Sequence, residues 1–250
     1  VCAGLWMSEI IPLPVTALLV PVLAYFFKIL SPVAAMAPFS NTIIFLFMGG
    51  FTLAALLNKH GIDLWLAERV IRLAQGSLWL SVVGFYAITS ILSMFISNTA
   101  TTAMMVPIAV SLIDKKFPRM RTMLILGTAY AANIGGNGTV VGSPPNGIAA
   151  AALNLSFIDW FKIGFPTMLL MFPLVVIALW YVIKPESDAY VNRLDSDNFI
   201  WTPLAKGTIV LFLFTVTCWI LSSQLSGYFG LKKFDHMIAI LITALAPAFG

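Results

Sequence analysis

The polar tripeptide Ser97-Asn98-Thr99 interrupts a long apolar part of the chain. From Leu73 to Ile113 the sequence contains no Asp, Glu, Lys or Arg. Side chains of Ser, Asn and Thr can bond to the local backbone, so they compete with the hydrogen bonds of a helix. In a membrane, a broken helix persists only where protein or a water-filled cavity satisfies the freed backbone groups. The tripeptide therefore predicts a binding site.

A second interruption follows in the segment GGNGTVVGSPPNGI at 135–148. Gly costs about 1 kcal/mol and Pro about 3 kcal/mol at an interior helix position, so we expect the backbone to unwind between Asn133 and Asn146. Unwound carbonyls can coordinate Na⁺, and a helix that restarts after Pro144 points free N–H groups toward an anion. The helix that restarts after Asn98 does the same. Together the two breaks predict a joint site for a cation and an anion.

Charged side chains are missing from the second break as well, because no Asp, Glu, Lys, Arg or His occurs from Thr122 to Ser156. A proton relay or a buried Arg clamp would need such a residue. Neutral donors from Asn98, Thr99 and Ser143 would therefore hold an anion, and co-bound cations would balance its charge. This pattern favours Na⁺ coupling over H⁺ coupling.

The composition indicates an all-α integral membrane protein. Apolar residues make up 60% of the chain and charged residues 10%, against about 45–50% and 25% in soluble domains. Since a span needs about 20 residues, 78–113 and 123–153 are too long for one crossing. The net charge of +4 is modest, and we expect no nucleic-acid partner. The predicted apolar segments are 10–30, 41–57, 78–113, 123–153, 164–183, 207–225 and 236–250.

The placement of basic residues predicts that 78–113 is a re-entrant hairpin. If it crossed the membrane once, the basic loops 58–77 and 114–122 would lie on opposite sides, against the positive-inside rule. A hairpin returns the chain to the cytoplasmic side and places ten of the fourteen Lys and Arg residues there. The four on the outside are Lys28, Lys162, Lys232 and Lys233.

The segment 62–76, which directly precedes the hairpin, is expected to form an amphipathic helix at the membrane interface. An ordinary surface linker is the alternative. Its polar face carries Glu68, Arg72 and Gln75, and its apolar face carries Leu66, Val70 and Leu73. The polar stretch 184–206 is predicted to be a cytoplasmic loop between two structural repeats, or else a linker within one domain.

Two other classes of protein could contain such polar breaks. Small residues in membrane helices also serve close helix packing, as in a purely structural bundle, but two successive polar breaks argue against that interpretation. An intramembrane enzyme with a hydroxyl nucleophile would need a base, and neither broken segment contains His, Lys or Asp.

Three motifs resemble the divalent-anion/sodium symporter family, which includes the sodium-coupled dicarboxylate and citrate carriers. The resemblance covers essentially the whole chain. It rests on WMSEIIPLPVTALL (6–19), SNTATTAMMVPI (97–108) and GGNGTVVGSPPNGI (135–148).

The resemblance implies a homodimeric inverted-repeat transporter of the elevator type. Residues 1–77 would form scaffold spans with an interfacial arm helix, and 78–183 would form half of the transport domain. That half contains the hairpin 78–113, the broken helix 123–153 and the span 164–183, and 207–250 would start the second repeat. Since the chain begins without Met and stops at Gly250 inside an apolar run, we expect a fragment that lacks a second Ser-Asn-Thr hairpin.

The same resemblance implies specific site residues. A co-transported Na⁺ would be held by Ser93, Ser97, Asn98 and the carbonyl of Gly142, with Gly138 as the alternative to Gly142. The substrate carboxylate would meet Asn98 and Thr99, and Ser143 and Pro144 would line the pocket.

The predicted function is Na⁺-coupled symport of C4-dicarboxylates (succinate, malate or fumarate) across a bacterial inner membrane. Within the same fold, the alternatives are a sodium-independent dicarboxylate exchanger and a carrier of citrate or sulfate.

Overall fold

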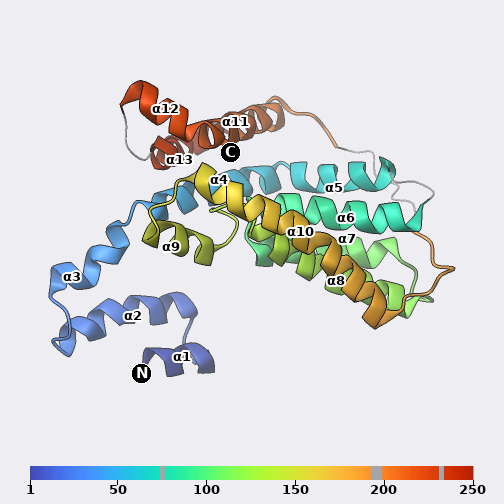
Figure 1. The fold of residues 1–250 in the computed structure, drawn as a ribbon, viewed down its shortest axis with the longest axis horizontal. Coiled ribbons are helices and arrows are strands. Elements are labelled where there is room, and N and C mark those ends of the chain that lie inside the picture. The colour runs from blue at the N-terminus through green and yellow to red at the C-terminus, as the bar shows by residue number, and fades with distance from the viewer. Residues whose placement is uncertain (74–76, 193–198, 231–233, 250) are drawn as a thin grey trace. The chain divides into compact units, whose positions relative to one another are not determined.

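The computed structural model describes residues 1–73, 77–192, 199–230 and 234–249 (Figure 1). Every regular element in these ranges is a helix, apart from an isolated bridge between Ile113 and Val191, so the predicted all-α class is confirmed. The chain divides into two compact units, Val1–Ile44 and Phe45–Gly250. The predictions made for Gln75, Arg193, Lys232 and Lys233 lie outside the described residues.

The first unit is a short helical segment. Ser31 begins α3 by accepting the N–H of Ala34 at its Oγ, with a distance of 3.2 Å. Prolines stand in the first turns of α2 and α3, where a missing N–H costs little. The elements are α1 (Cys2–Ser8), α2 (Leu13–Phe26), α3 (Pro32–Met36) and the 3₁₀ helix η1 (Ala37–Ser40).

The second unit holds the two predicted breaks. Where 78–113 was expected to be interrupted, the structure has two helices, and the predicted unwinding between Asn133 and Asn146 is observed at 137–143. The helices, of which α4 starts just before the unit boundary, are α4 (Ile43–Lys59), α5 (Ile62–Leu73), α6 (Leu78–Ser93), α7 (Asn98–Leu112), α8 (Pro118–Gly136), α9 (Pro144–Ala152), α10 (Phe157–Ile183), α11 (Pro203–Ile220), α12 (Ser222–Phe229), α13 (Phe234–Leu245) and η2 (Ala246–Phe249).

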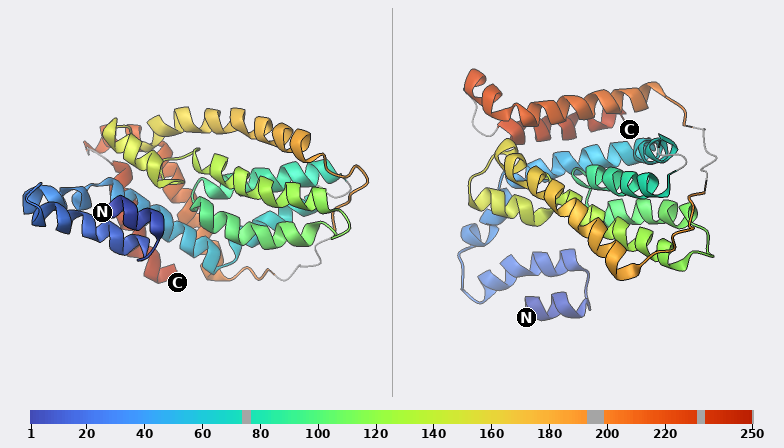
Figure 2. Two further views of the ribbon diagram at one scale, coloured as in Figure 1. Left: turned by 90° about the horizontal axis from the view of Figure 1, so that it is seen from below. Right: turned by 45° about the vertical axis from the view of Figure 1, so that its right-hand side comes forward.

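Helix α8 is the centre of this unit, and α6, α7 and α10 pack along it (Figure 2). Small residues on α8 allow the close approach of α6. A Cβ on Gly135 would collide with the backbone of Ser90, and Ser90 Oγ donates to the carbonyl of Ala131 at 2.9 Å. Tyr86 Oη likewise donates to the carbonyl of Met123 at 2.7 Å. These contacts fix the end of α6 against α8.

Helix α5 forms within the segment predicted to be amphipathic, and Leu66 and Val70 of the predicted apolar face pack partly buried against the core. Leu73 is 76% exposed, whereas Ala67 and Ile71 pack against α6. The small side chain of Ala67 lets α5 approach α6 more closely than a leucine would. Asp63 on the same helix is also buried, which the sequence pattern did not indicate.

The apolar helices agree with an integral membrane protein. Among the residues that the structure describes, three segments are long and apolar enough to span a membrane: Pro32–Lys59, Phe157–Ile183 and Pro203–Ile220. Helix α10 starts earlier than the predicted span 164–183, because Ser156 and Asp159 form a capping box at its N-terminus. At 16 and 15 residues, α6 and α7 are shorter than the roughly 20 residues of a full crossing.

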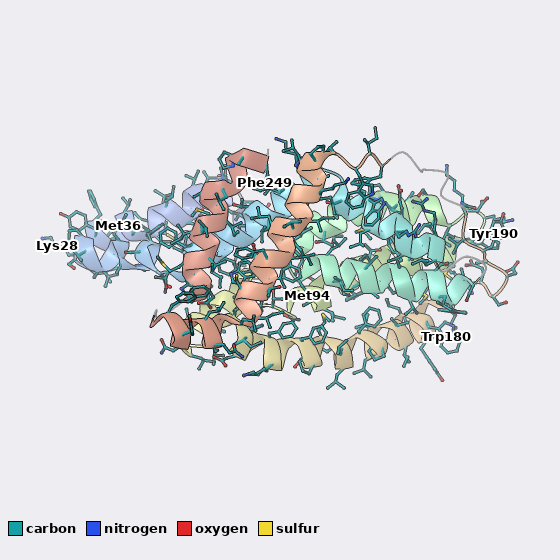
Figure 3. All side chains as sticks on the ribbon, turned by 90° about the horizontal axis from the view of Figure 1, so that it is seen from above. Lys28, Met36, Met94, Trp180, Tyr190 and Phe249 are labelled. Carbon is teal, nitrogen blue, oxygen red and sulfur yellow. The ribbon has the colours of Figure 1, made fainter. Side chains whose placement is uncertain are left out.

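The chain after α10 returns to the end of the bundle where α7 ends and α8 begins. The Glu186 carboxylate accepts the N–H groups of Arg119 and Met120 at 3.1 and 2.8 Å. Asn192 donates its N–H to the carbonyl of Leu112 at 2.8 Å. Tyr190, which Figure 3 places at the same end of the unit as Trp180, packs edge-on against Phe117. This segment therefore fixes one end of the α7–α8 pair.

Candidate functional site

The first break joins α6 to α7 and carries the Ser-Asn-Thr tripeptide. Ser97 caps the N-terminus of α7, and its Oγ accepts the N–H of Ala100 at 3.3 Å. Ser93, at the end of α6, donates its hydroxyl to Oδ1 of Asn98 at 2.9 Å. Asn98 Nδ2 donates to Oδ1 of Asn133 on α8 at 3.1 Å. The Asn98 side chain thus connects both helices of the hairpin to α8.

The second break lies between α8 and α9 and is fixed by two polar side chains. Thr139 Oγ1 donates to the carbonyl of Met94 in the first break and accepts the N–H of Gly142 at 3.1 Å. Asn146 Nδ2 donates to the carbonyls of Gly136 and Thr139, both at 2.8 Å. Met94, whose carbonyl accepts the hydrogen bond of Thr139 in the first break, is labelled in Figure 3. The two breaks therefore form one hydrogen-bonded structure.

Two glycines allow these breaks to approach each other. A Cβ on Gly136 would lie 2.9 Å from Cγ of Asn98, and a Cβ on Gly142 would lie 2.9 Å from the carbonyl oxygen of Ser93. Real Cβ atoms do not make contacts this short. Asn98 starts α7, and Gly142 stands two residues before α9. The N-terminal ends of two helices therefore flank the C-terminal end of α8.

The electrostatics of this region come from dipoles. Helix α7 has 15 residues and α9 has nine, and each directs a positive end with free N–H groups toward the break before it. The end of α8 contributes carbonyl groups and the opposite dipole sign. Oxygen atoms for a hard cation and N–H donors for an anion thus occur together.

The structure places the predicted site residues at different depths. Ser93 and Gly142 are buried, Ser97, Asn98 and Ser143 are half-buried, and Thr99 and Pro144 are exposed. Ser93, Asn98 and Gly142 are brought together around Gly136. Ser143 precedes α9 without capping it by a side-chain hydrogen bond, and Pro144 is the first residue of that helix. Gly138, the alternative to Gly142, packs against Met94 and Met168.

Four residues that organise this region were not assigned a role from the sequence. Their signal was weak, because each is a small or amide residue in a segment already rich in such residues. Thr139 and Asn146 are buried, and their partners lie in the two breaks. The four are Asn133, Gly136, Thr139 and Asn146.

Comparison with known proteins identifies the family. The family described as "Citrate transporter" (CitMHS) matches residues 3–248. The chain belongs to this family. The family is one of transporters rather than enzymes, and it agrees with the resemblance to divalent-anion/sodium symporters.

Individual relatives carry transporter names. An "Uncharacterized transporter" of Haemophilus influenzae is 39% identical over 251 residues, which cover 96% of this chain and 54% of the relative. The "Sodium-dependent dicarboxylate transporter SdcS" of Staphylococcus saprophyticus is 34% identical over 267 residues, with 96% and 51% covered. The "Sodium-dependent high-affinity dicarboxylate transporter 3" of Caenorhabditis elegans is 31% identical over 253 residues, with 88% and 45% covered.

The chain spans about half the length of these curated relatives.

Proposed function

We propose that the protein is a Na⁺-coupled symporter of C4-dicarboxylates. Two relatives named as sodium-dependent dicarboxylate transporters support this substrate class and this coupling ion. The observation that carries the proposal is the position of Asn98. Its side chain contacts Ser93 and Asn133 and lies beside Gly136, where two helix N-termini and an unwound backbone meet.

In the proposed site, Na⁺ is bound by oxygen atoms of Ser93, Ser97, Asn98 and Gly142. The Asn98 Oδ1 atom, which accepts from Ser93 Oγ, is available to a cation when that hydroxyl rotates. A carboxylate of the substrate meets Asn98, the exposed hydroxyl of Thr99 and the hydroxyl of Ser143, with Pro144 lining the pocket. Na⁺ placed next to the carboxylate offsets its charge, and this charge balance makes the two ligands bind better together than separately.

In this proposal, transport occurs when the region around α6–α10, which carries the site, moves. The hairpin of α6 and α7 is re-entrant in this proposal, and the transport half moves past a scaffold in an elevator motion within a homodimer. The protein works in a bacterial inner membrane. Succinate, malate and fumarate each carry two carboxylates, of which the described site receives one.

The test is uptake of labelled succinate by full-length protein in proteoliposomes, with an inward Na⁺ gradient or with Na⁺ replaced by choline. We expect uptake with Na⁺ and a reduction to background with choline. Equal uptake in both salts would contradict the coupling and favour a sodium-independent exchanger.

Citrate is the second candidate substrate, and the name of the matching family favours it. Competition distinguishes the candidates. An excess of unlabelled succinate, malate or fumarate should suppress succinate uptake, whereas citrate and sulfate should leave it nearly unchanged. Stronger inhibition by citrate than by succinate would reassign the substrate within the same site.

A further inference from the structure

A buried carboxylate lies outside the site described above. Asp63 stands in the first turn of α5 and is only 1% exposed. Its Oδ1 accepts the N–H of Leu64 at 2.8 Å, and its Oδ2 accepts from Nδ2 of Asn58 at 3.0 Å. Within the described residues, no Lys or Arg forms an ion pair with this carboxylate. A buried anion held by neutral donors alone is costly unless a proton or a cation neutralises it.

The carboxylate borders a cavity with a volume of about 350 Å³. The cavity lies between the end of α4, the start of α5 and the hairpin, and its polar lining consists of Asn58, Asp63 and Ser97. The remaining lining is mainly alanine and larger apolar side chains. A single water needs roughly 30 Å³ of liquid volume, so the cavity has room for an ion together with several waters.

The polar lining offers oxygen atoms for such an ion. Both hydrogen bonds of the Asn58 side chain within the described residues use its NH₂ group, to Asp63 Oδ2 at 3.0 Å and to Met104 Sδ at 3.7 Å. Its amide oxygen is therefore available as a ligand. The Ser97 hydroxyl accepts one backbone N–H and retains a further lone pair. A carboxylate, an amide oxygen and a hydroxyl are the ligands that hard cations prefer.

The surroundings of Asp63 also set its affinity for a proton. The pKa of this carboxyl is raised above its ordinary value, because burial outweighs the lowering by the Asn58 amide and the Leu64 N–H. The hydrogen bond from Asn58 favours the charged form, and the cavity supplies space beside that form. The buried charged form therefore needs a neutralising partner, and the cavity beside it has room for a cation.

We propose that this cavity is a second Na⁺ site, with Asp63 as its anionic ligand, the Asn58 amide oxygen as a neutral ligand and Ser97 at its border. It differs from the Asn98 site in having a formal charge and in using α4 and α5. The inference deepens the proposed function, because Ser97 borders both sites and a second Na⁺ would add to the charge that balances a dicarboxylate. Na⁺ at Asp63 also orients the Ser97 side chain at the start of α7.

Equilibrium binding of ²²Na⁺ to purified full-length protein at pH 7.5 tests this proposal. Asp63→Asn keeps the shape of the side chain and removes its charge, and we expect one fewer Na⁺ per chain at saturation. Asn98→Ala should remove a different Na⁺, so the double variant should lose both. Asp188→Asn, which removes an exposed carboxylate, is the matched control and should bind as the wild type does.

Two further variants keep the test decisive if Asp63→Asn fails to fold. Ala55→Leu fills the cavity and leaves the carboxylate in place, so it should also lose one Na⁺. Asn58→Ala should weaken the same Na⁺ by about tenfold, since a polar ligand beside a charge is lost.

Unchanged Na⁺ binding in Asp63→Asn or Ala55→Leu would overturn the second site. If Asp63→Asn retains full Na⁺ binding but changes the pH dependence of succinate uptake, the second Na⁺ site is overturned and Asp63 is a proton site. Loss of one Na⁺ in Asp63→Asn with normal binding in Asn98→Ala would support the second site and refute the proposed Asn98 site.

Discussion

Thr139 connects the two breaks through a single hydroxyl group. It donates to the carbonyl of Met94 and accepts the N–H of Gly142, and its side chain is fully buried. The carbonyl and the N–H would both lose their partner if the hydroxyl were removed. At residue scale, therefore, the geometry around Gly142 depends on Thr139 as much as on the residues that face the proposed ligands.

Thr139→Val should destabilise the protein by about 1–3 kcal/mol, because a buried donor and a buried acceptor are left unpaired without a change in side-chain volume. The measurement is the midpoint of thermal unfolding in detergent, with and without Na⁺. We expect a lower midpoint and a smaller Na⁺-induced rise than in the wild type. Thr139→Ser keeps the hydroxyl and should behave nearly as the wild type, and equal losses in both variants would contradict this role.

Gly136 permits the close approach of the Asn98 amide. In Gly136→Ala the added Cβ would lie 2.9 Å from Cγ of Asn98 and would push that side chain away from its partners. The loss of one such polar contact predicts a reduction of Na⁺-dependent succinate uptake by roughly tenfold at subsaturating Na⁺.

The matched control is Gly227→Ala on α12, where no atom lies within 4 Å of the added Cβ. This variant should retain uptake and should gain slightly in stability, since Ala is favoured over Gly in a helix by about 1 kcal/mol. Equal uptake by Gly136→Ala and Gly227→Ala would contradict the importance of the Asn98 position.

At the scale of elements, Glu186 fixes the N-terminus of α8. Its carboxylate accepts two N–H groups of the first turn, those of Arg119 and Met120. Burial raises the pKa of Glu186, but these backbone N–H groups and the nearby Arg119 charge lower it, and the resulting pKa lies below the ordinary value of 4.5. The negative charge also interacts favourably with the positive end of the α8 dipole.

The lowered pKa gives this contact a defined pH dependence. A carboxyl whose pKa is lower in the folded state contributes its stabilisation above its unfolded value of 4.5 and loses it as the pH falls through the folded-state pKa. As the pH falls from 7 to 3, the thermal unfolding midpoint should therefore decline less steeply for Glu186→Gln than for the wild type. Identical pH profiles would show that the cap contributes nothing measurable.

The positions of the breaks followed from the sequence, but the contacts between them did not. Gly and Pro between Asn133 and Asn146 make a continuous helix too costly, so the unwinding at 137–143 was predictable from local rules. The bonds of Thr139 and Asn146 depend on which backbone groups come close in space, and sequence spacing carries no such information. For the same reason the sequence did not show that, beside Leu66 and Val70 of the predicted apolar face, Ala67 and Ile71 are the most buried apolar residues of this part of α5.

For the whole molecule, the membrane topology decides whether α6 and α7 form a re-entrant hairpin. On a background without Cys2 and Cys218, the variants Lys59→Cys and Lys115→Cys should both react with an impermeant thiol reagent from the cytoplasmic side. Both lysines are exposed and lie on either side of the hairpin. The positive-inside rule places their loops on the same face of the membrane.

Lys162→Cys is the control for the opposite face. Lys162 is largely exposed beside Asp159, at the start of α10, and should react only from the outside. Labelling of Lys59→Cys and Lys115→Cys from opposite sides would mean that the segment between them crosses the membrane once.

In the proposed function Asn98 couples Na⁺ to a dicarboxylate, so transport by Asn98→Ala is the decisive measurement. Labelled succinate uptake should be measured in proteoliposomes with full-length wild type, Asn98→Ala and the control Asn154→Gly. Asn154 is an exposed asparagine whose left-handed backbone (φ 53°) glycine tolerates. The account predicts that Na⁺-dependent uptake falls to background in Asn98→Ala, with folding intact by gel filtration, and persists in Asn154→Gly. Undiminished Na⁺-dependent uptake by Asn98→Ala would contradict it.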